Sequence, residues 1–147
     1  MNHRDTEYEE KSPESVNGLT EKIIGAAIEV HRTLGSGLLE SAYEECLAYE
    51  LSQRRLKFKR QQPLPVIYKG ARLDCGYRLD LVVETRVILE LKAVESILPI
   101  HQAQLLSYLR LSGIKWELLF NFHTSVLKHG IRRMACQVSS VFSVSLW

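Results

Sequence analysis

The sequence predicts an α/β domain in which a mixed β-sheet is flanked by α-helices. Apolar residues recur at helical spacing in three stretches, whereas the segments between and after them alternate in polarity or run continuously apolar, as strands do. The order is helix, helix, three or four strands, helix, strand, strand. The strand–helix–strand step implies a right-handed crossover and one parallel pair of strands. The length of 147 residues fits a single domain with a core of its own.

The two ends of the chain lack these patterns. We expect residues 1–18 to be a flexible arm, residues 19–136 the folded domain, and residues 137–147 a tail of ambiguous structure. The three cysteines lie far apart without a C-x-x-C pair, which is typical of a reducing compartment. No signal peptide is visible, nor any apolar run of the ~18 residues that span a membrane. We therefore expect a cytoplasmic protein without a membrane partner.

The elements follow from local signals. Thr20 is the predicted cap of a first helix, which Gly35-Ser36-Gly37 ends, and a second helix is expected at about 38–53. The region from Phe58 to Val94 has the pattern of strands. Pro63 and Pro65 mark the first as an edge or bulged strand, because proline cannot donate to a ladder. Lys69-Gly70 predicts a hairpin turn. A third helix is expected at 99–112, followed by strands at 116–122 and 131–135.

An acid pair is the most informative feature of the sequence. Asp80 and Glu90 lie in two apolar segments, 77–83 and 87–92, joined by a short polar turn. A turn centred on Thr85 sets Asp80 opposite Glu90, with Cβ atoms ~4.5–5.5 Å apart. Two carboxylates this close in apolar surroundings repel each other and need a cation between them.

The same pair could serve metal-assisted phosphodiester hydrolysis. Magnesium takes oxygen ligands from one or two carboxylates, and Asp80, Glu90 and the main-chain carbonyl of Leu91 could supply them. Such an ion polarises a phosphoryl oxygen and acidifies a bound water. Lys92 shares a face with Glu90 and could stabilise the developing negative charge. The alternative is that the acids are solvated strand residues which Lys92 neutralises.

Three helical residues are further candidates. Glu40 stands in the first turn of the second helix, where an acid could join the site or only interact with the helix dipole. Gln104 and Tyr108 are four residues apart on the third helix and therefore share a face. They could face the acid pair and bind water or phosphate, or Gln104 could sit at the rim of a helix that packs through its leucines.

Basic residues concentrate between the second helix and the first strand. Five of seven consecutive positions are cationic, which can track a phosphate backbone or be a solvated loop after a helix: Arg54, Arg55, Lys57, Lys59 and Arg60. The net charge of +2 is too small to identify a nucleic-acid partner by itself.

Taken together, these residues resemble the PD-(D/E)XK nuclease superfamily, and more closely the small bacterial and archaeal group called GxxExxY proteins. The naming motif stands here as Gly37-Leu38-Leu39-Glu40-Ser41-Ala42-Tyr43. The segments 24–31, 73–80 and 90–94 are also similar to that group, and the resemblance covers roughly residues 19–134. Arg78-Leu79 replaces the proline that precedes the first acid, which the motif tolerates. The tail after Ala135 follows no pattern of the group.

The resemblance implies a restriction-endonuclease-like fold and a Mg²⁺- or Mn²⁺-dependent nuclease, with DNA as the expected substrate. It implies Asp80, Glu90 and Lys92 as the catalytic core, Glu40 as a helix-borne acid and metal ligand, and Gln104 and Tyr108 as the Gln-x-x-x-Tyr pair of the exonuclease branch. A nucleic-acid- or protein-binding module whose catalysis has lapsed is the alternative. Hydrolysis of RNA or a nucleotide is a third reading. Endo- or exonucleolytic cutting and homo-oligomerisation stay open.

Overall fold

A computed structural model describes residues 15–136 and 144–146 of the chain. Most of the expected arm and tail therefore lies outside the described residues. The elements in chain order are α2 (Val16–Leu34), α3 (Glu40–Gln53), β1 (Phe58–Pro63), β2 (Val66–Tyr68), β3 (Ala71–Leu73), β4 (Arg78–Val83), β5 (Val87–Lys92), α4 (Pro99–Ser112), β6 (Trp116–Asn121), the 3₁₀ helix η1 (Leu127–Gly130), β7 (Ile131–Cys136) and β8 (Val144–Leu146).

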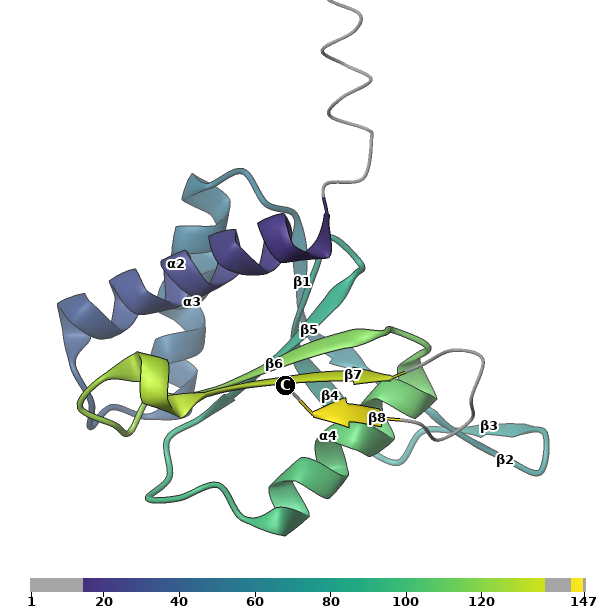
Figure 1. Cartoon of the computed structure of the whole chain (residues 1–147). Helices are drawn as coiled ribbons and strands as arrows, with labels where there is room; N and C mark the ends of the chain where they lie inside the picture. The colour runs from purple at the N-terminus through teal and green to yellow at the C-terminus, as the bar shows by residue number, and fades with distance from the viewer. Residues whose placement is uncertain (1–14, 137–143, 147) are drawn as a thin grey trace, which may run out of the picture.

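The strands form one mixed sheet and one separate hairpin (Figure 1). The six-stranded sheet has the order β1-β4-β5-β6-β7-β8, and β2 pairs only with β3. Strands β5 and β6 run parallel with α4 as their crossover, whereas the other neighbours in the sheet are antiparallel. Strand β1 lies at an edge, as its prolines predicted. The predicted class, a mixed sheet flanked by helices, is confirmed.

Helices cover both faces of this sheet. Helices α2 and α3 lie on one face and α4 lies on the other (Figure 1). The buried apolar residues divide accordingly into two clusters. The larger joins α2 and α3 to residues such as Leu81 and Leu89, and the smaller joins α4 to residues such as Ile88 and Leu119. We name these sides the α3 face and the α4 face. Burial of apolar area at roughly 25 cal/mol per Å² holds each layer on the sheet.

Helix α2 begins earlier than predicted. Ser15 is its N-cap, and the Ser15 hydroxyl accepts a hydrogen bond from the Gly18 N–H at 3.1 Å. Thr20, the predicted cap, is buried inside the helix and donates to the Asn17 carbonyl instead. Serine and threonine are both good caps, so the cap alone could not choose between them. The predicted end of the helix at Gly35 is confirmed, and this glycine has a φ of +76°.

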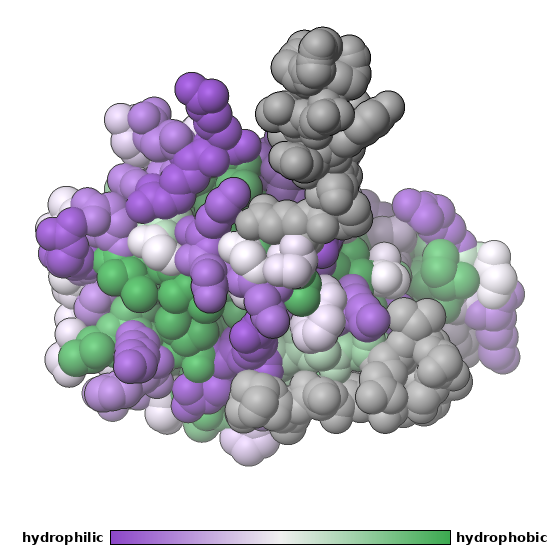
Figure 2. Space-filling view, turned by 45° about the horizontal axis from the view of Figure 1, so that its top comes forward, coloured by the Kyte–Doolittle hydropathy of each residue, from purple (hydrophilic) through white to green (hydrophobic). Residues whose placement is uncertain are grey.

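The surface seen in Figure 2 is mostly hydrophilic, with hydrophobic side chains gathered in its left half and again at its right end. The β2–β3 hairpin projects from the right side of the molecule in Figure 1, and it exposes Ile67, Tyr68 and Leu73. Within residues 15–136 and 144–146, no helix has the length and apolar character needed to cross a membrane.

Candidate active site

The hairpin of β4 and β5 has the predicted register. Leu81 lies opposite Leu89 and Val83 lies opposite Val87, so the turn centres on Thr85. Beyond Leu81 the ladder stops, and Asp80 has no backbone pair partner on β5. The ladder between β1 and β4 also skips Asp80. Asp80 therefore lies at a position of β4 that has no ladder partner in either neighbouring strand.

The two acids provide the hydrogen bonds that the ladder lacks at this point. The Leu91 N–H donates to Asp80 Oδ2 at 2.9 Å, and the Asp80 N–H donates to Glu90 Oε2 at 3.4 Å. The two carboxyl groups also lie close enough for Asp80 to raise the pKa of Glu90. Leu79 packs on the α4 face and Leu81 on the α3 face, although residues two apart in a strand normally share a face. This irregularity of β4 brings Asp80 and Glu90 together.

Glu90 is buried and Asp80 is half-buried, and the charge of the pair is only partly compensated. Glu90 is 6% exposed, and burial together with the neighbouring charge of Asp80 raises its pKa to about 8. Burial also raises the pKa of Asp80, although the hydrogen bond from Leu91 opposes the shift. The positive charge of Lys92 lowers the pKa of both acids without cancelling the effect of burial. A carboxyl pair in this state holds either a proton or a cation.

The motif that contains Gly37, Glu40 and Tyr43 has a structural role in front of α3. Gly37 has a φ of +105°, a conformation that favours glycine. Tyr43 is fully buried and stacks on Phe122, with ring centroids 4.3 Å apart. The Tyr43 hydroxyl donates to the Gly35 carbonyl at 2.7 Å. These contacts fix the turn from which Glu40 starts the helix.

Glu40 reaches the end of β5 from this position. Its Oε2 atom accepts a hydrogen bond from the Ala93 N–H at 3.0 Å, one residue beyond Lys92, and the side chain is exposed. Glu40 therefore holds the chain that follows the lysine. Among the described residues, no three His, Cys, Asp or Glu side chains are arranged to hold one metal ion. The expected grouping of Glu40 with Asp80 and Glu90 around one ion is thus not formed, because Glu40 bonds the main chain.

The remaining donors still fit a divalent cation. Asp80 and Glu90 offer carboxylate oxygens, the ligand type that magnesium prefers. Their burial and mutual contact leave a negative charge that Lys92 does not fully offset. A cation bound between them would offset the charge of Asp80 that, together with burial, raises the pKa of Glu90. The chemistry of the donor set is therefore that of a magnesium or manganese site.

On helix α4, Tyr108 lies near enough to the acid pair to be affected by its charge, whereas Gln104 is exposed. Tyr108 is half-buried, and burial followed by the charge of Glu90 raises its pKa. Its ring contacts that of Tyr77, with centroids 6.1 Å apart. Gln104 is exposed to solvent, which agrees with the alternative that it sits at the rim of the helix. Four residues turn a helix by about 40° beyond one full circle, which suffices to carry Gln104 past the rim.

Glu117 in β6 was not predicted as part of the site. Glu117 is 1% exposed, and neither of its carboxyl oxygens has a hydrogen-bond partner among the described residues. Burial, followed by the charges of Glu90 and Asp80, raises its pKa well above the usual range. Its place in the apolar run 116–122 was the available signal, since a buried acid without a partner is costly.

Gln61 is the second residue that sequence reasoning missed. It has a φ of +51° at the break between β1 and β4. Its amide donates to Glu44 Oε1 at 2.8 Å and to Asp80 Oδ1 at 3.5 Å. Gln61 thus links the buried Glu44 of α3 to the acid pair. No spacing in the sequence could reveal this link, because it depends on the pairing of β1 with β4.

The basic run does not form one continuous cationic track. Arg54 pairs with Glu50, and Arg60 pairs with Glu44 and Glu45 of α3. The other three cations, Arg55, Lys57 and Lys59, are exposed, and within the part of the chain that the structure describes they form no ion pair. Acids on α3 therefore neutralise two of the five predicted binding residues.

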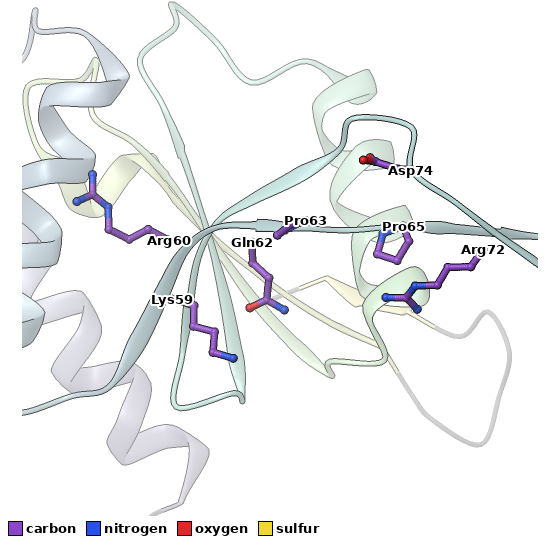
Figure 3. A pocket seen from close by; sticks show the side chains of 7 residues that line it. All are labelled: Lys59, Arg60, Gln62, Pro63, Pro65, Arg72 and Asp74. Atoms are coloured by element: carbon purple, nitrogen blue, oxygen red, sulfur yellow. The ribbon is translucent and has the colours of Figure 1, made fainter.

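A groove of about 740 Å³ adjoins β1 (Figure 3). We name it the β1 groove; it is lined by Lys59, Arg60, Gln62, Pro63, Pro65, Arg72 and Asp74.

The acid pair and Lys92 thus lie together on the central strands of a mixed sheet that helices flank on both faces. A sequence model of the PD-(D/E)XK nuclease superfamily matches residues 17–134. The chain belongs to the PD-(D/E)XK nuclease superfamily, and its sheet and flanking helices form the restriction-endonuclease-like fold. Searches among curated proteins and among solved structures found no match to the chain. Membership of this superfamily points to a nuclease, whose substrate is a nucleic acid.

Proposed function

We propose that the protein is a cytoplasmic, divalent-cation-dependent nuclease that hydrolyses phosphodiester bonds of DNA. The observation that carries this proposal is the contact between the buried carboxyl group of Glu90 and the half-buried carboxyl group of Asp80, with Lys92 beside them. Membership of the superfamily supports it independently. The segment from Gly37 to Tyr43 supports a closer affiliation with the GxxExxY group.

Each residue has a role in this proposal. Asp80 and Glu90 hold Mg²⁺ or Mn²⁺, with the Leu91 carbonyl as a further ligand. When bound, such an ion polarises a phosphoryl oxygen and acidifies a water. Lys92 stabilises the negative charge that develops on the phosphate.

The helices complete the proposed site. Glu40 acts by holding the chain after Lys92 through its bond to Ala93. Tyr108 donates a hydrogen bond to the substrate phosphate, and Gln104, at the exposed rim of α4, contacts a more distant part of the strand. The basic residues 54–60 contribute phosphate contacts, chiefly through Arg55, Lys57 and Lys59, which form no ion pair with any described residue.

Cation binding and cleavage together test the proposal. Purified wild-type protein and Asp80→Asn are compared in EDTA, Mg²⁺ and Mn²⁺, with labelled single-stranded DNA, duplex DNA and RNA. The cation should raise the melting temperature of the wild type but not of Asp80→Asn, and only the wild type should cut. Cutting of RNA alone would overturn the assignment of DNA. An equal cation response in both proteins would overturn the assigned metal site.

A binding module on the same fold is the second candidate. The observation that favours it is that Glu40 does not join the acid pair, so that no third carboxylate completes a metal site in the described residues. Wild-type protein that binds nucleic acid but cuts neither DNA nor RNA in either metal would decide for this candidate.

A further inference from the structure

We propose that the β1 groove binds the phosphate backbone of the substrate strand and leads it to the acid pair. Lys59, Gln62 and Arg72 are the residues that make this site. The inference rests on the proposed function, because it takes the ligand to be the nucleic acid that the acid pair hydrolyses. It adds two residues, Gln62 and Arg72, that lie outside the basic run.

The backbone of β1 places Lys59 and Gln62 on the same side. These residues are three apart, and a regular strand would point them to opposite faces. The left-handed conformation of Gln61 shifts the alternation. Figure 3 shows the Lys59 and Gln62 side chains pointing together into the groove, with the Arg72 side chain extending toward them from the hairpin. Arg60 points the other way, where Glu44 and Glu45 bind it.

The groove carries an excess of positive charge. Lys59 and Arg72 are exposed and form no ion pair within the described residues. The acid that lines the groove, Asp74, lies 4.0 Å from the Arg78 guanidinium and accepts a hydrogen bond from the Gly76 N–H at 2.9 Å. Its charge is thereby partly offset. Two cations with a neutral amide donor between them match the charge and the acceptor oxygens of a phosphate backbone.

The groove lies on the same face of the sheet as the catalytic acids. Lys59 is opposite Val82 and Gln62 is opposite Leu79, and both partners pack on the α4 face. Glu90 follows Ile88 of that face by two residues. Strand β4 alone separates β1 from β5. Two strand spacings amount to about 10 Å, so a backbone in the groove can extend to the acid pair without crossing the sheet.

The floor of the groove is rigid. Pro63 and Pro65 fix the backbone after Gln62 and have no N–H groups. A charged, proline-bearing edge strand also prevents pairing with strands of other molecules. If Lys59 and Arg72 served only to prevent such pairing, replacing them would not change the affinity for nucleic acid. Binding measurements therefore separate this protective role from phosphate binding.

The test compares Lys59→Ala/Arg72→Ala with Lys115→Ala/Lys128→Ala. The second variant removes the same charge from residues that do not line the groove. Binding of labelled single-stranded and duplex DNA is measured in EDTA, which prevents cleavage, over a range of salt concentrations. For single strands each lost phosphate contact lowers the salt slope by about 0.7. The groove variant should therefore lose about 1.4 in slope and on the order of 10-fold in affinity near 0.1 M salt.

Substitutions of Gln62 that add a positive or a negative charge test the same groove in opposite directions. Gln62→Lys should bind more tightly than the wild type, and Gln62→Glu should bind more weakly. Gln62 is half-buried, and thermal melting of each variant checks that these substitutions leave the fold intact. Equal losses in the groove variant and the control variant would overturn the proposal.

The experiments can overturn the proposed role of the groove without overturning the nuclease assignment, and the reverse. If the wild type cuts DNA and the groove variant binds as tightly as the wild type, the groove is excluded while the nuclease stands. If the groove variant loses affinity but the wild type cuts nothing, the groove stands on a binding module. Wild-type protein that binds no nucleic acid overturns both.

Discussion

The carboxyl group of Glu90 affects both the stability of the folded protein and the proposed binding of a cation. It is buried beside Asp80, and the resulting pKa of about 8 means that the cation-free protein holds a proton there near neutral pH. A bound divalent cation would compete with that proton. Stability in the absence of metal therefore reports on the same interaction that the proposed chemistry uses.

The first prediction concerns pH. The folded protein keeps a proton on Glu90 that the unfolded chain releases above a pKa of about 4.5. Stability should therefore be greatest at low pH and fall as the pH rises from about 4.5 to about 8, in total on the order of a few kcal/mol. Urea unfolding in EDTA at several pH values measures this slope. Glu90→Gln should reduce this slope, and the raised pKa values of Asp80 and Glu117 account for what remains. An unchanged slope in Glu90→Gln would contradict the assigned cause.

The second prediction concerns Glu117, whose replacement should raise the free energy of unfolding, whereas most core mutations lower it. Its buried carboxyl group has no hydrogen-bond partner among the described residues, so it costs free energy in the folded state. Glu117→Leu should raise the free energy of unfolding by about 1–3 kcal/mol at pH 7. Glu21→Leu on exposed helix surface is the control and should change it by less than about 0.5 kcal/mol. Loss of stability in Glu117→Leu would show that this acid has a partner.

Reasoning from the sequence located site residues that a short turn or a helical repeat brings together. It missed residues that meet only when distant strands pair. Asp80 and Glu90 were found because one short turn sets their register. Tyr108 was found by its helical spacing, but the same spacing left the place of Gln104 open, and Gln104 is exposed. Gln61 escaped because its contact to Asp80 requires the pairing of β1 with β4.

At the scale of elements, a loop held by Asn121 supports the end of β5. The Asn121 side chain accepts from the Val94 N–H at 3.1 Å and donates to the Val94 carbonyl at 2.9 Å. Gly130 of η1 packs against the Asn121 main chain, where a Cβ atom would lie 2.4 Å from the Asn121 carbonyl oxygen. The position of Lys92 and the chain after it thus depends on close packing around one glycine.

The third prediction compares two glycines. Gly130→Ala should destabilise the protein by about 1–3 kcal/mol, because backbone atoms must move to admit the methyl group. Gly25→Ala is the matched control, since a Cβ there meets no atom within 4 Å in the exposed middle of α2. That substitution should stabilise by roughly 0.5–1 kcal/mol. Chemical denaturation of both variants measures the difference, and equal effects would contradict the packing described for Gly130.

The helices and strands were predicted correctly where glycine or proline marks a turn, a helix end or an edge strand. Proline restricts the backbone, whereas glycine allows the left-handed conformations that Gly70 and Gly113 adopt. The turn at Lys69-Gly70, the end of the third helix and the edge strand that contains Pro63 were placed correctly. The start of α2 was misplaced because two good caps compete there. The pairing of β8 with β7 was not predicted, because the tail has no clear period.

At the scale of the whole molecule, the site lies on the central strands of the sheet, between the two helical layers. The α3 side contributes Glu40 and the Gln61–Glu44 link, whereas α4 contributes Tyr108. The strands between them carry the acid pair and Lys92. The class of fold followed from periodicity and one crossover, but the β1 groove did not, because it arises from the hairpin folding back beside an edge strand.

The central claim is that Lys92 and the acid pair act together in metal-dependent cleavage. Single-turnover cleavage of DNA in Mg²⁺ or Mn²⁺ by wild type, Lys92→Ala and the control Lys128→Ala tests it most directly. Lys92→Ala should lose ~10²–10³ in rate while keeping its fold and its DNA affinity, because one electrostatic stabiliser of the developing charge is removed. Lys128→Ala should cut like the wild type. Wild-type protein that does not cut, or Lys92→Ala that cuts at the wild-type rate, would contradict the account.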